Sequence, residues 1–416
     1  MTNLFELTQS PIFNEKGCEC GNIHKIDFCV EIDLDLVKVC REIVPKGGLV
    51  FILAGESIPY NFTDELHQNL LNSGFEVVRF EPEVESVQTF SLPDGCNLIL
   101  GIGDSALIER CKLLSASFDT KLVAVPTRFD IAKVGLGVSE IDYGGTVLSR
   151  PSRKPDKIVL LSNLFANLNS QEFADIFGEF CSFSLAFCDY AYRETKNGGW
   201  CDQILKSATT LFWEILECSP NKSQEKIKEI LPKIVQINIL LGVIGIESGA
   251  EQLSSCLARF FAKKGRKGSS KGERLIMSAY LLSVTYANFL SERRKYFVPD
   301  TNLGLDKAKR LFGMSEKECV ENGKSFHSQT FDYDDFVVGS CFSELHAVAV
   351  DIGKILAKSF SIYRKLRQDF GYGIKERISV SEMLDIISGS VFCNRWDTLF
   401  TFIKERGVLE FKTTKI

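Results

Sequence analysis

The sequence predicts an α/β domain of the nucleotide-binding type followed by an all-α domain. The chain has 416 residues, which exceeds an ordinary single core and suits two domains. Up to about residue 165, short apolar runs alternate with amphipathic stretches, which is typical of a parallel sheet covered by helices. Beyond about residue 170, apolar residues recur with the spacing of long helices. The predicted domains are therefore residues 1–165 and 166–416.

The strands of the first domain are predicted from apolar runs rich in β-branched residues. Two segments between these runs, Thr63–Asn72 and Ser105–Ser117, have the apolar spacing of helices. A strand followed by a glycine-containing turn and a helix is expected over Asn97–Ser117. The predicted strands are Leu49–Ala54, Phe75–Phe80, Asn97–Gly101, Leu122–Val125 and Lys157–Leu161.

The second domain is predicted to be helical, with one irregular and more polar segment at Asn302–Asp335. A cleft between two such domains is where a ligand is expected. The predicted helices are Ser170–Arg193, Ile204–Leu216, Gln224–Ile246, Gly249–Lys263, Gly272–Arg293, Phe342–Phe370, Ser379–Ser388 and Arg395–Arg406.

The composition excludes several classes of protein. A formal charge of -5 gives no basic field for nucleic acid. No apolar stretch reaches the roughly 18–20 residues of a membrane span, and the segment from Met1 to Glu15 does not resemble a secretory signal. Most of the 14 cysteines stand alone in apolar segments, where they pack as small core residues. We expect a reduced, cytoplasmic protein without a disulfide framework.

One group of cysteines is clustered in the sequence. Cys18 and Cys20 are separated by one residue, and His24 follows closely. A structural zinc site has four ligands, usually with two to four residues between paired cysteines. Because the group supplies only three ligands at a shorter spacing, we favour a surface loop and keep zinc as the alternative.

Residues 248–256, SGAEQLSSC, and residues 271–274, KGER, carry a resemblance to a known family. They resemble the motifs SGAEHxxSH and HGExV of the sn-glycerol-1-phosphate dehydrogenases, which belong to the iron-alcohol-dehydrogenase and dehydroquinate-synthase-like superfamily. Residues 101–112 are similar to the family's GxGSGTxxDxxK loop, and residues 125–127 to its VPT segment. Residues 173–176 and the segments 394–399 and 405–409 resemble later family motifs, and the Cys-x-Cys-Gly start resembles that of bacterial members.

The resemblance implies NAD(P)-dependent hydride transfer assisted by a divalent metal ion. The family's metal ligands, one Asp and two His, correspond here to Asp175, Gln252 and Lys271. Only Asp175 is a plausible ligand, because an amide oxygen binds zinc poorly and an ammonium group is repelled by a cation. We therefore do not expect zinc or nickel at this site. Cys256 is expected to be a packed core residue rather than a thiolate ligand.

Two interpretations of Lys271 are open. Its ammonium group could replace the lost metal ion and neutralise Asp175 through a charge-assisted hydrogen bond. Alternatively, it could point into solvent from the polar run Lys263–Lys271. Glu179 stands where the family has a lysine, and this change inverts a charge near the expected substrate phosphate. Candidate cations for that phosphate are Lys112, Arg128 and Lys133.

The resemblance also places a cofactor site at residues 101–105. A dinucleotide binds such a turn because glycines allow close approach to the pyrophosphate and the helix N-terminus attracts it. Gly101 and Gly103 are retained, but Asp104 adds a negative charge and Ser105 replaces a glycine. Either residue could cap the following helix in place of the phosphate. The alternative is a tolerated variation that still binds NAD(P), and the remaining candidate contacts are then Glu56 and Thr127.

Three functions are consistent with these residues. The first is a glycerol-1-phosphate dehydrogenase-like protein with lost or strongly impaired hydride transfer, acting as a sensor or partner subunit. The second is an active NAD(P)-dependent oxidoreductase on glycerol-1-phosphate, dihydroxyacetone phosphate or a related polyol phosphate. The third is a metal-independent lyase or cyclase. We favour the first, with a small-molecule ligand in the interdomain cleft and a homodimer as open features.

Overall fold

The computed structural model describes residues 18, 20, 24, 29–80, 92–143, 146–195, 199–246, 248–265, 269–291, 308–315, 341–367, 379–390 and 398–400. Its chain divides into two compact units. The first contains Met1–Asn169 and Pro220–Val243, and the second contains Ser170–Ser219 and Ile244–Ile416. The sequence predicted one boundary, between residues 165 and 166, whereas the chain enters the first unit twice.

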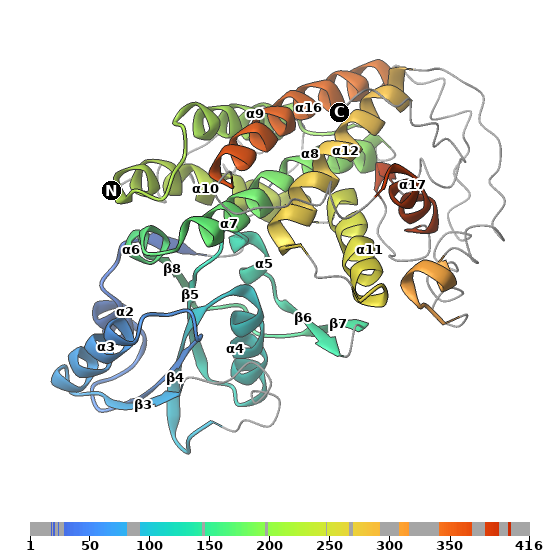
Figure 1. The fold of residues 1–416 in the computed structure, drawn as a ribbon. Helices are drawn as coiled ribbons and strands as arrows, with labels where there is room; N and C mark the ends of the chain where they lie inside the picture. Colours follow the sequence, from blue (N-terminus) through green and yellow to red (C-terminus); the bar gives the residue numbers. More distant parts are fainter. Residues whose placement is uncertain are drawn as a thin grey trace. The chain divides into compact units, whose positions relative to one another are not determined.

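The first unit is built on a parallel sheet (Figure 1). Its described residues form six strands in the order β1-β8-β5-β4-β2-β3. The chain passes from β3 back across β2 to β4, so the strand order reverses at β2 and β4. Ligands of such sheets bind at the carboxyl ends of the strands beside this switch point. The strands are β1 (Val30–Ile32), β2 (Leu49–Ala54), β3 (Glu76–Phe80), β4 (Cys96–Gly103), β5 (Lys121–Pro126) and β8 (Lys157–Leu160).

The predicted α/β class is confirmed, and all five predicted strands are present. The sequence did not predict the three-residue β1 or the antiparallel hairpin of β6 (Val138–Tyr143) and β7 (Thr146–Pro151). The helices of this part are α2 (Leu36–Ile43), α3 (Tyr60–Asn72), α4 (Ser105–Ser117), α5 (Ile131–Val134) and α6 (Ser162–Ala166).

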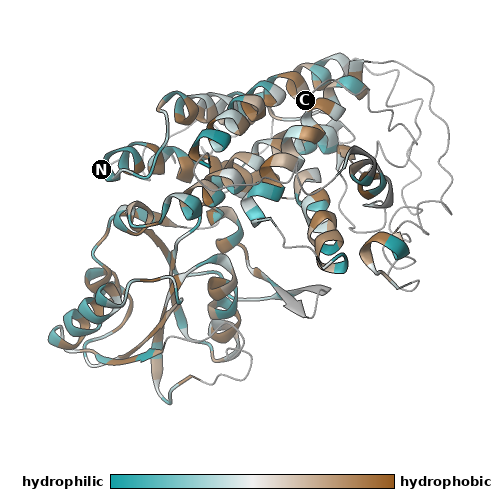
Figure 2. Ribbon diagram, viewed as in Figure 1, coloured by the Kyte–Doolittle hydropathy of each residue, from teal (hydrophilic) through white to brown (hydrophobic). Residues whose placement is uncertain are grey.

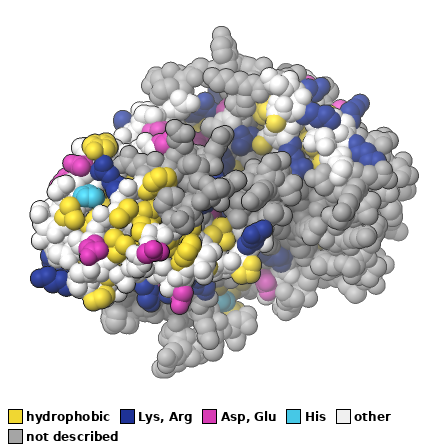
Figure 3. All heavy atoms as spheres, turned by 90° about the horizontal axis from the view of Figure 1, so that it is seen from below, with side chains coloured by type: hydrophobic (Ala, Val, Ile, Leu, Met, Phe, Trp, Pro, Cys, Tyr) yellow, Lys and Arg dark blue, Asp and Glu magenta, His cyan; other side chains and the backbone are white. Residues whose placement is uncertain are grey.

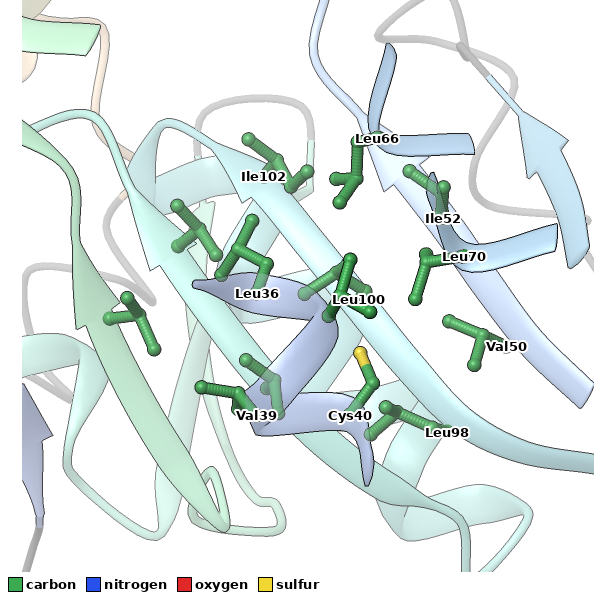
Figure 4. Packing of buried hydrophobic residues seen from close by; sticks show 14 of the residues in the cluster. Leu36, Val39, Cys40, Val50, Ile52, Leu66, Leu70, Leu98, Leu100 and Ile102 are labelled. Atoms are coloured by element: carbon green, nitrogen blue, oxygen red, sulfur yellow. The ribbon is translucent and has the colours of Figure 1, made fainter. Parts of the chain in front are cut away.

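Both faces of the sheet are covered, because side chains alternate between the faces along each strand. Val50 and Ile52 of β2 lie in a buried cluster with residues of α2 and α3, as the packing in Figure 4 shows. Phe51 and Leu53 belong to a second cluster that includes residues of α4. The central strands are therefore hydrophobic on both sides, and Figure 2 shows them largely in the hydrophobic colour.

Helix α10 (Gln224–Ile244) is held to the first unit by a buried amide. The side chain of Asn238 accepts the N–H of Ala132 at 2.9 Å and donates to the carbonyl oxygen of Phe129 at 2.9 Å. Asn238 is fully buried, so both main-chain groups are satisfied within the core. This contact explains why Pro220–Val243 belongs with the sheet rather than with the later helices.

The described part of the second unit is helical. The sequence predicted one helix over Ser170–Arg193, but the chain forms two, which are interrupted at Phe183. Nearly every residue around the interruption is buried, so the apolar pattern continues through it. The helices of this unit are α7 (Ser170–Ser182), α8 (Ser184–Thr195), α9 (Asp202–Glu217), α11 (Gly249–Lys263), α12 (Lys271–Ser291), α16 (Cys341–Leu366) and α17 (Val380–Gly389).

Helix α12 is central to this unit and packs against α16, α7 and α11. Two sequence predictions fall largely outside the described residues, namely the irregular segment Asn302–Asp335 and the helix Arg395–Arg406. Within the first of them, residues 308–312 are helical.

No single described helix is long and apolar enough to cross a membrane, and α10 with α11 meets that test only as a pair bent by 94°. On the face drawn in Figure 3, described acidic and basic side chains are interspersed among hydrophobic ones.

Candidate functional site

The predicted cofactor residues lie along one edge of the parallel sheet. Glu56 follows β2, Gly101 and Gly103 end β4, and Thr127 follows β5. These three strands are neighbours, so their carboxyl ends meet at the same edge. The N–H of Thr127 donates to the carbonyl oxygen of Gly103 at 2.8 Å. Glu56 is exposed beside this edge.

Asp104 caps helix α4. Its carboxylate accepts the main-chain N–H of Leu107 at 3.0 Å. This N–H belongs to the first turn of the helix, where an unpaired donor would otherwise attract a phosphate. Asp104 therefore places a carboxylate at the N-terminus of α4 and pairs one of its first-turn N–H groups.

Ser105 also has a partner within the unit. Its hydroxyl donates to the carboxylate of Asp130. Asp130 is almost fully buried and stands just before α5. Ser105 therefore contacts a residue from the next strand-to-helix connection, and Asp130 is a second carboxylate near this edge.

The two retained glycines have a packing role. A Cβ atom at Gly101 would lie 2.7 Å from the Sγ of Cys111, and one at Gly103 would lie 2.6 Å from a methyl carbon of Leu107. Both contacts are made with α4. A side chain at either position would therefore force the side chain of Cys111 or Leu107 on α4 to shift, whether or not a nucleotide binds.

Lys112, one of the cations suggested for a substrate phosphate, does not fit that role. Its side chain is fully buried, with the ammonium group 3.1 Å from the Glu109 carboxylate and 2.8 Å from the carbonyl oxygen of Val138. Burial lowers the pKa of Lys112, and Glu109 opposes this change. This lysine joins α4 to the hairpin. A second suggested cation, Lys133, forms an ion pair with Glu140 at 2.7 Å.

In the second unit, Asp175 caps a helix. Its carboxylate accepts the N–H of Gly272, the second residue of α12, at 2.8 Å. A Cβ atom at Gly272 would lie 1.8 Å from the carbonyl oxygen of Asp175. The glycine of the KGER segment is therefore retained because α7 and α12 approach each other very closely here.

Gln252 is a buried residue of α11, and its side-chain oxygen accepts the hydroxyl of Thr398 at 3.1 Å. The amide oxygen that could coordinate a metal ion is thus hydrogen-bonded to a neighbouring side chain. Cys256, one turn further along, is fully buried, as expected for a core residue. Burial of this whole helix face gives the SGAEQLSSC segment a structural role.

Lys271 forms an ion pair with Glu179. The Glu179 side chain is only 3% exposed, whereas that of Lys271 is 42% exposed. The sequence predicted either Asp175 or solvent as the surroundings of the Lys271 ammonium group and did not predict Glu179. The ion pair joins the two positions at which the family pattern has a lysine and a histidine.

Sequence reasoning missed a buried carboxylate at the start of α11. Asp189 is fully buried and accepts the N–H of Gly249 at 2.8 Å, the N–H of Leu399 at 2.9 Å and the hydroxyl of Tyr286 at 2.9 Å. Burial raises the pKa of Asp189 to about 6, against the opposing effect of these donors. A Cβ at Gly249 would lie 2.4 Å from the Tyr286 oxygen. The glycine of the SGAE segment is thus also explained by packing.

The residues at the family's metal positions do not fit a divalent cation. They offer one carboxylate that caps a helix, one neutral amide oxygen and one ammonium group. A further cation, Arg274, interacts electrostatically with Asp175 and Glu179. Positive charge is therefore already supplied by side chains where the family pattern places a metal ion.

Comparison with known proteins gives relatives at low identity. No family model matches the chain. The glycerol-1-phosphate dehydrogenase (NAD(P)+) of Methanosarcina barkeri is 21% identical over 285 residues, which cover 64% of this chain and 80% of the relative. The protein of the same description from Methanothrix thermoacetophila is 20% identical over 269 residues, which cover 61% and 73%.

Solved structures with the same fold cover most of the chain. The iron-containing alcohol dehydrogenase of Thermotoga maritima has a TM-score of 0.55 and 11% identity, and the match covers 92% of this chain and 97% of that protein. The enzyme of Thermococcus thioreducens has a TM-score of 0.55 and 16% identity, covering 92% and 98%. The chain therefore has the fold of the iron-containing alcohol dehydrogenases, and its sequence is similar to those of glycerol-1-phosphate dehydrogenases.

Proposed function

We propose that this chain is a glycerol-1-phosphate dehydrogenase-like protein in which metal-dependent hydride transfer is lost or strongly impaired. The main support for the proposal is that the three residues at the family's metal positions are engaged in interactions within the protein. Asp175 caps α12, Gln252 is bonded to Thr398, and Lys271 is paired with Glu179. Without a Lewis acid, a substrate hydroxyl is not activated for hydride transfer by the family's mechanism.

The cofactor edge supports the same proposal through charge. Asp104 accepts a first-turn N–H of α4, and Asp130 lies close by in contact with Ser105. Two carboxylates beside the phosphate position oppose a doubly charged pyrophosphate, because like charges a few ångströms apart repel by about 1 kcal/mol or more. We propose that NAD(P) binds weakly or not at all.

The second candidate is an active NAD(P)-dependent oxidoreductase on glycerol-1-phosphate or a related polyol phosphate. It is favoured by the sheet edge, where Gly101, Gly103 and an exposed Glu56 keep their family positions. In this case Asp175 would have to leave the N-terminus of α12 to become a ligand, and Lys271 would have to be displaced.

Two binding measurements on the full chain separate these candidates. Purified protein is supplied with zinc or nickel and titrated with NADH and NADPH, while oxidation of glycerol-1-phosphate is followed optically. We expect that no bound metal is lost when Asp175 is replaced, that NADH and NADPH do not bind with micromolar affinity, and that glycerol-1-phosphate is not oxidised. Metal that is lost in Asp175→Asn, together with micromolar NADH binding, would support the active oxidoreductase and overturn the proposal.

Restoration of the family residues provides a second test. The variant Gln252→His with Lys271→His restores two ligands but removes the ion pair between Lys271 and the buried Glu179. We therefore expect metal binding to return only when Glu179→Lys is added, which restores the family's charge pattern. Metal binding by the double variant at full stability would show that the Lys271–Glu179 pair is not what closes the site.

A further inference from the structure

A second group of metal-binding side chains lies near the start of the chain, apart from the residues of the family's metal site. The Sγ atoms of Cys18 and Cys20 and a ring nitrogen of His24 all lie within 4.8 Å of one another. The Sγ of Cys20 and the Nε2 of His24 are 3.4 Å apart. The sequence favoured a simple surface loop here, but the structure brings the three ligand atoms together around one point.

These separations match those of ligands around one tetrahedral zinc ion. Zinc binds thiolate sulfur at about 2.3 Å and imidazole nitrogen at about 2.0 Å, so two such ligands lie about 3.5 Å apart. The distance between Cys20 and His24 has this value without an ion present. A small inward shift of the Cys18 thiol completes the same arrangement.

The chemistry of the ligands selects the metal. Thiolates with one imidazole favour zinc over magnesium, calcium or manganese, which prefer oxygen. Cys18 is buried, so the ligand sphere is partly shielded from water. Shielded thiolates are typical of structural rather than catalytic sites.

We propose that Cys18, Cys20 and His24, all in the first unit, bind one structural zinc ion. Their two thiolates and one imidazole supply three of the four positions of a tetrahedral zinc site. Binding releases the thiol protons to solvent.

The experiment measures zinc in the full chain, expressed with zinc and purified under reducing conditions. We expect about one zinc per chain in the unaltered protein and at least a tenfold loss in Cys20→Ser. Cys96→Ser is the matched control, because Cys96 is a partly exposed cysteine outside the group. His24→Cys is expected to keep the zinc with three thiolate ligands, whereas His24→Ala is expected to weaken its binding.

The variant Asp175→Asn distinguishes the proposed zinc site from the family's metal position. It leaves Cys18, Cys20 and His24 unchanged, so the protein is expected to keep its zinc. Loss of zinc in Asp175→Asn but not in Cys20→Ser would overturn both the zinc site and the proposed function. Unaltered protein whose thiols are free and which binds no added zinc would overturn the zinc site alone. If Cys20→Ser does not fold, cobalt substitution of the unaltered protein decides. A thiolate-to-cobalt absorption band for two sulfurs is expected, and its absence contradicts the proposal.

Discussion

Lys271 at the first position of α12 forms an ion pair with the buried carboxylate of Glu179 on α7. The family pattern has a histidine and a lysine at these two positions. Lys271 supplies a cation to the buried glutamate that stands in place of the lysine, and Arg274 adds a second positive charge nearby. We therefore expect the two departures from the family pattern to be energetically coupled.

Removal of Lys271 should therefore destabilise the protein. The variant Lys271→Ala leaves Glu179 buried without this partner, and we expect a loss of about 1–2 kcal/mol, less than for a fully buried pair because the lysine is half exposed. The measurement is the free energy of unfolding in denaturant. The single variants Lys271→Glu and Glu179→Lys should each lower the free energy of unfolding. The double variant, which exchanges the two charges, should recover part of that loss. A loss equal to the sum of the two single losses would contradict the coupling.

Asp189 should give the stability a distinct pH dependence. Burial raises its pKa to about 6 in the folded state, above the value of about 4 in an unfolded chain. Between these two pKa values the folded protein binds a proton at Asp189 that the unfolded chain does not. The contribution of Asp189 to the free energy of unfolding is therefore complete below pH 4 and is lost as the pH rises through 6. The expected change is roughly 3 kcal/mol.

The measurement compares the unaltered protein with Asp189→Asn at several pH values between 4 and 7. The amide does not titrate, so the difference in unfolding free energy between the two proteins should change across this window. A constant difference would show that Asp189 is charged throughout and is stabilised by the N–H groups of Gly249 and Leu399.

Two glycine substitutions test the packing explanation of the retained motifs. In Gly272→Ala, the added methyl carbon would lie 1.8 Å from the Asp175 carbonyl oxygen, so the helices must move apart. We expect the free energy of unfolding to fall by about 3 kcal/mol or more. Gly353→Ala in α16 meets nothing closer than 3.8 Å, and this control should gain roughly 0.5–1 kcal/mol from helix propensity. Thermal unfolding distinguishes them, and equal effects would contradict the close approach.

Asp104 offers a test of the cap at the cofactor edge. Asp104→Ala should cost about 0.5–2 kcal/mol, whereas Asp104→Asn should keep the cap and remove only the charge. Isothermal titration with NADH then reports on the charge alone. Tighter binding by Asp104→Asn, with unchanged stability, is the expected result, and unchanged affinity would show that the carboxylate does not oppose the phosphates.

The sequence predicted the strands well because each central strand is a short apolar run, and β2 was predicted at its observed bounds. It missed β1, which has three residues and therefore too little pattern to detect. The interruption at Phe183 was hidden because α7 and α8 are both buried on nearly all sides.

The candidate site was predicted less well, because its state depends on partners distant in the sequence. Asp104 and Ser105 were both candidates for the helix cap from their residue types and positions, and the structure shows that Asp104 makes it. The cap made by Asp175 and the pair of Lys271 with Glu179 depend on how α7 meets α12. From the sequence, the retained glycines were interpreted as remnants of a metal site. The structure shows that a Cβ atom at Gly249 or Gly272 would clash with neighbouring atoms, which explains these glycines by packing.

The position of α10 has a consequence for synthesis of the protein. Asn238 satisfies main-chain groups of Phe129 and Ala132, which lie in the part of the chain made first. During synthesis, these groups therefore lack their hydrogen bonds to Asn238 while Ser170–Ser219 emerges from the ribosome. The first unit can complete its folding only after Val243 has left the exit tunnel. A fragment that ends at Asn169 is expected to expose this surface and to need a chaperone or to aggregate.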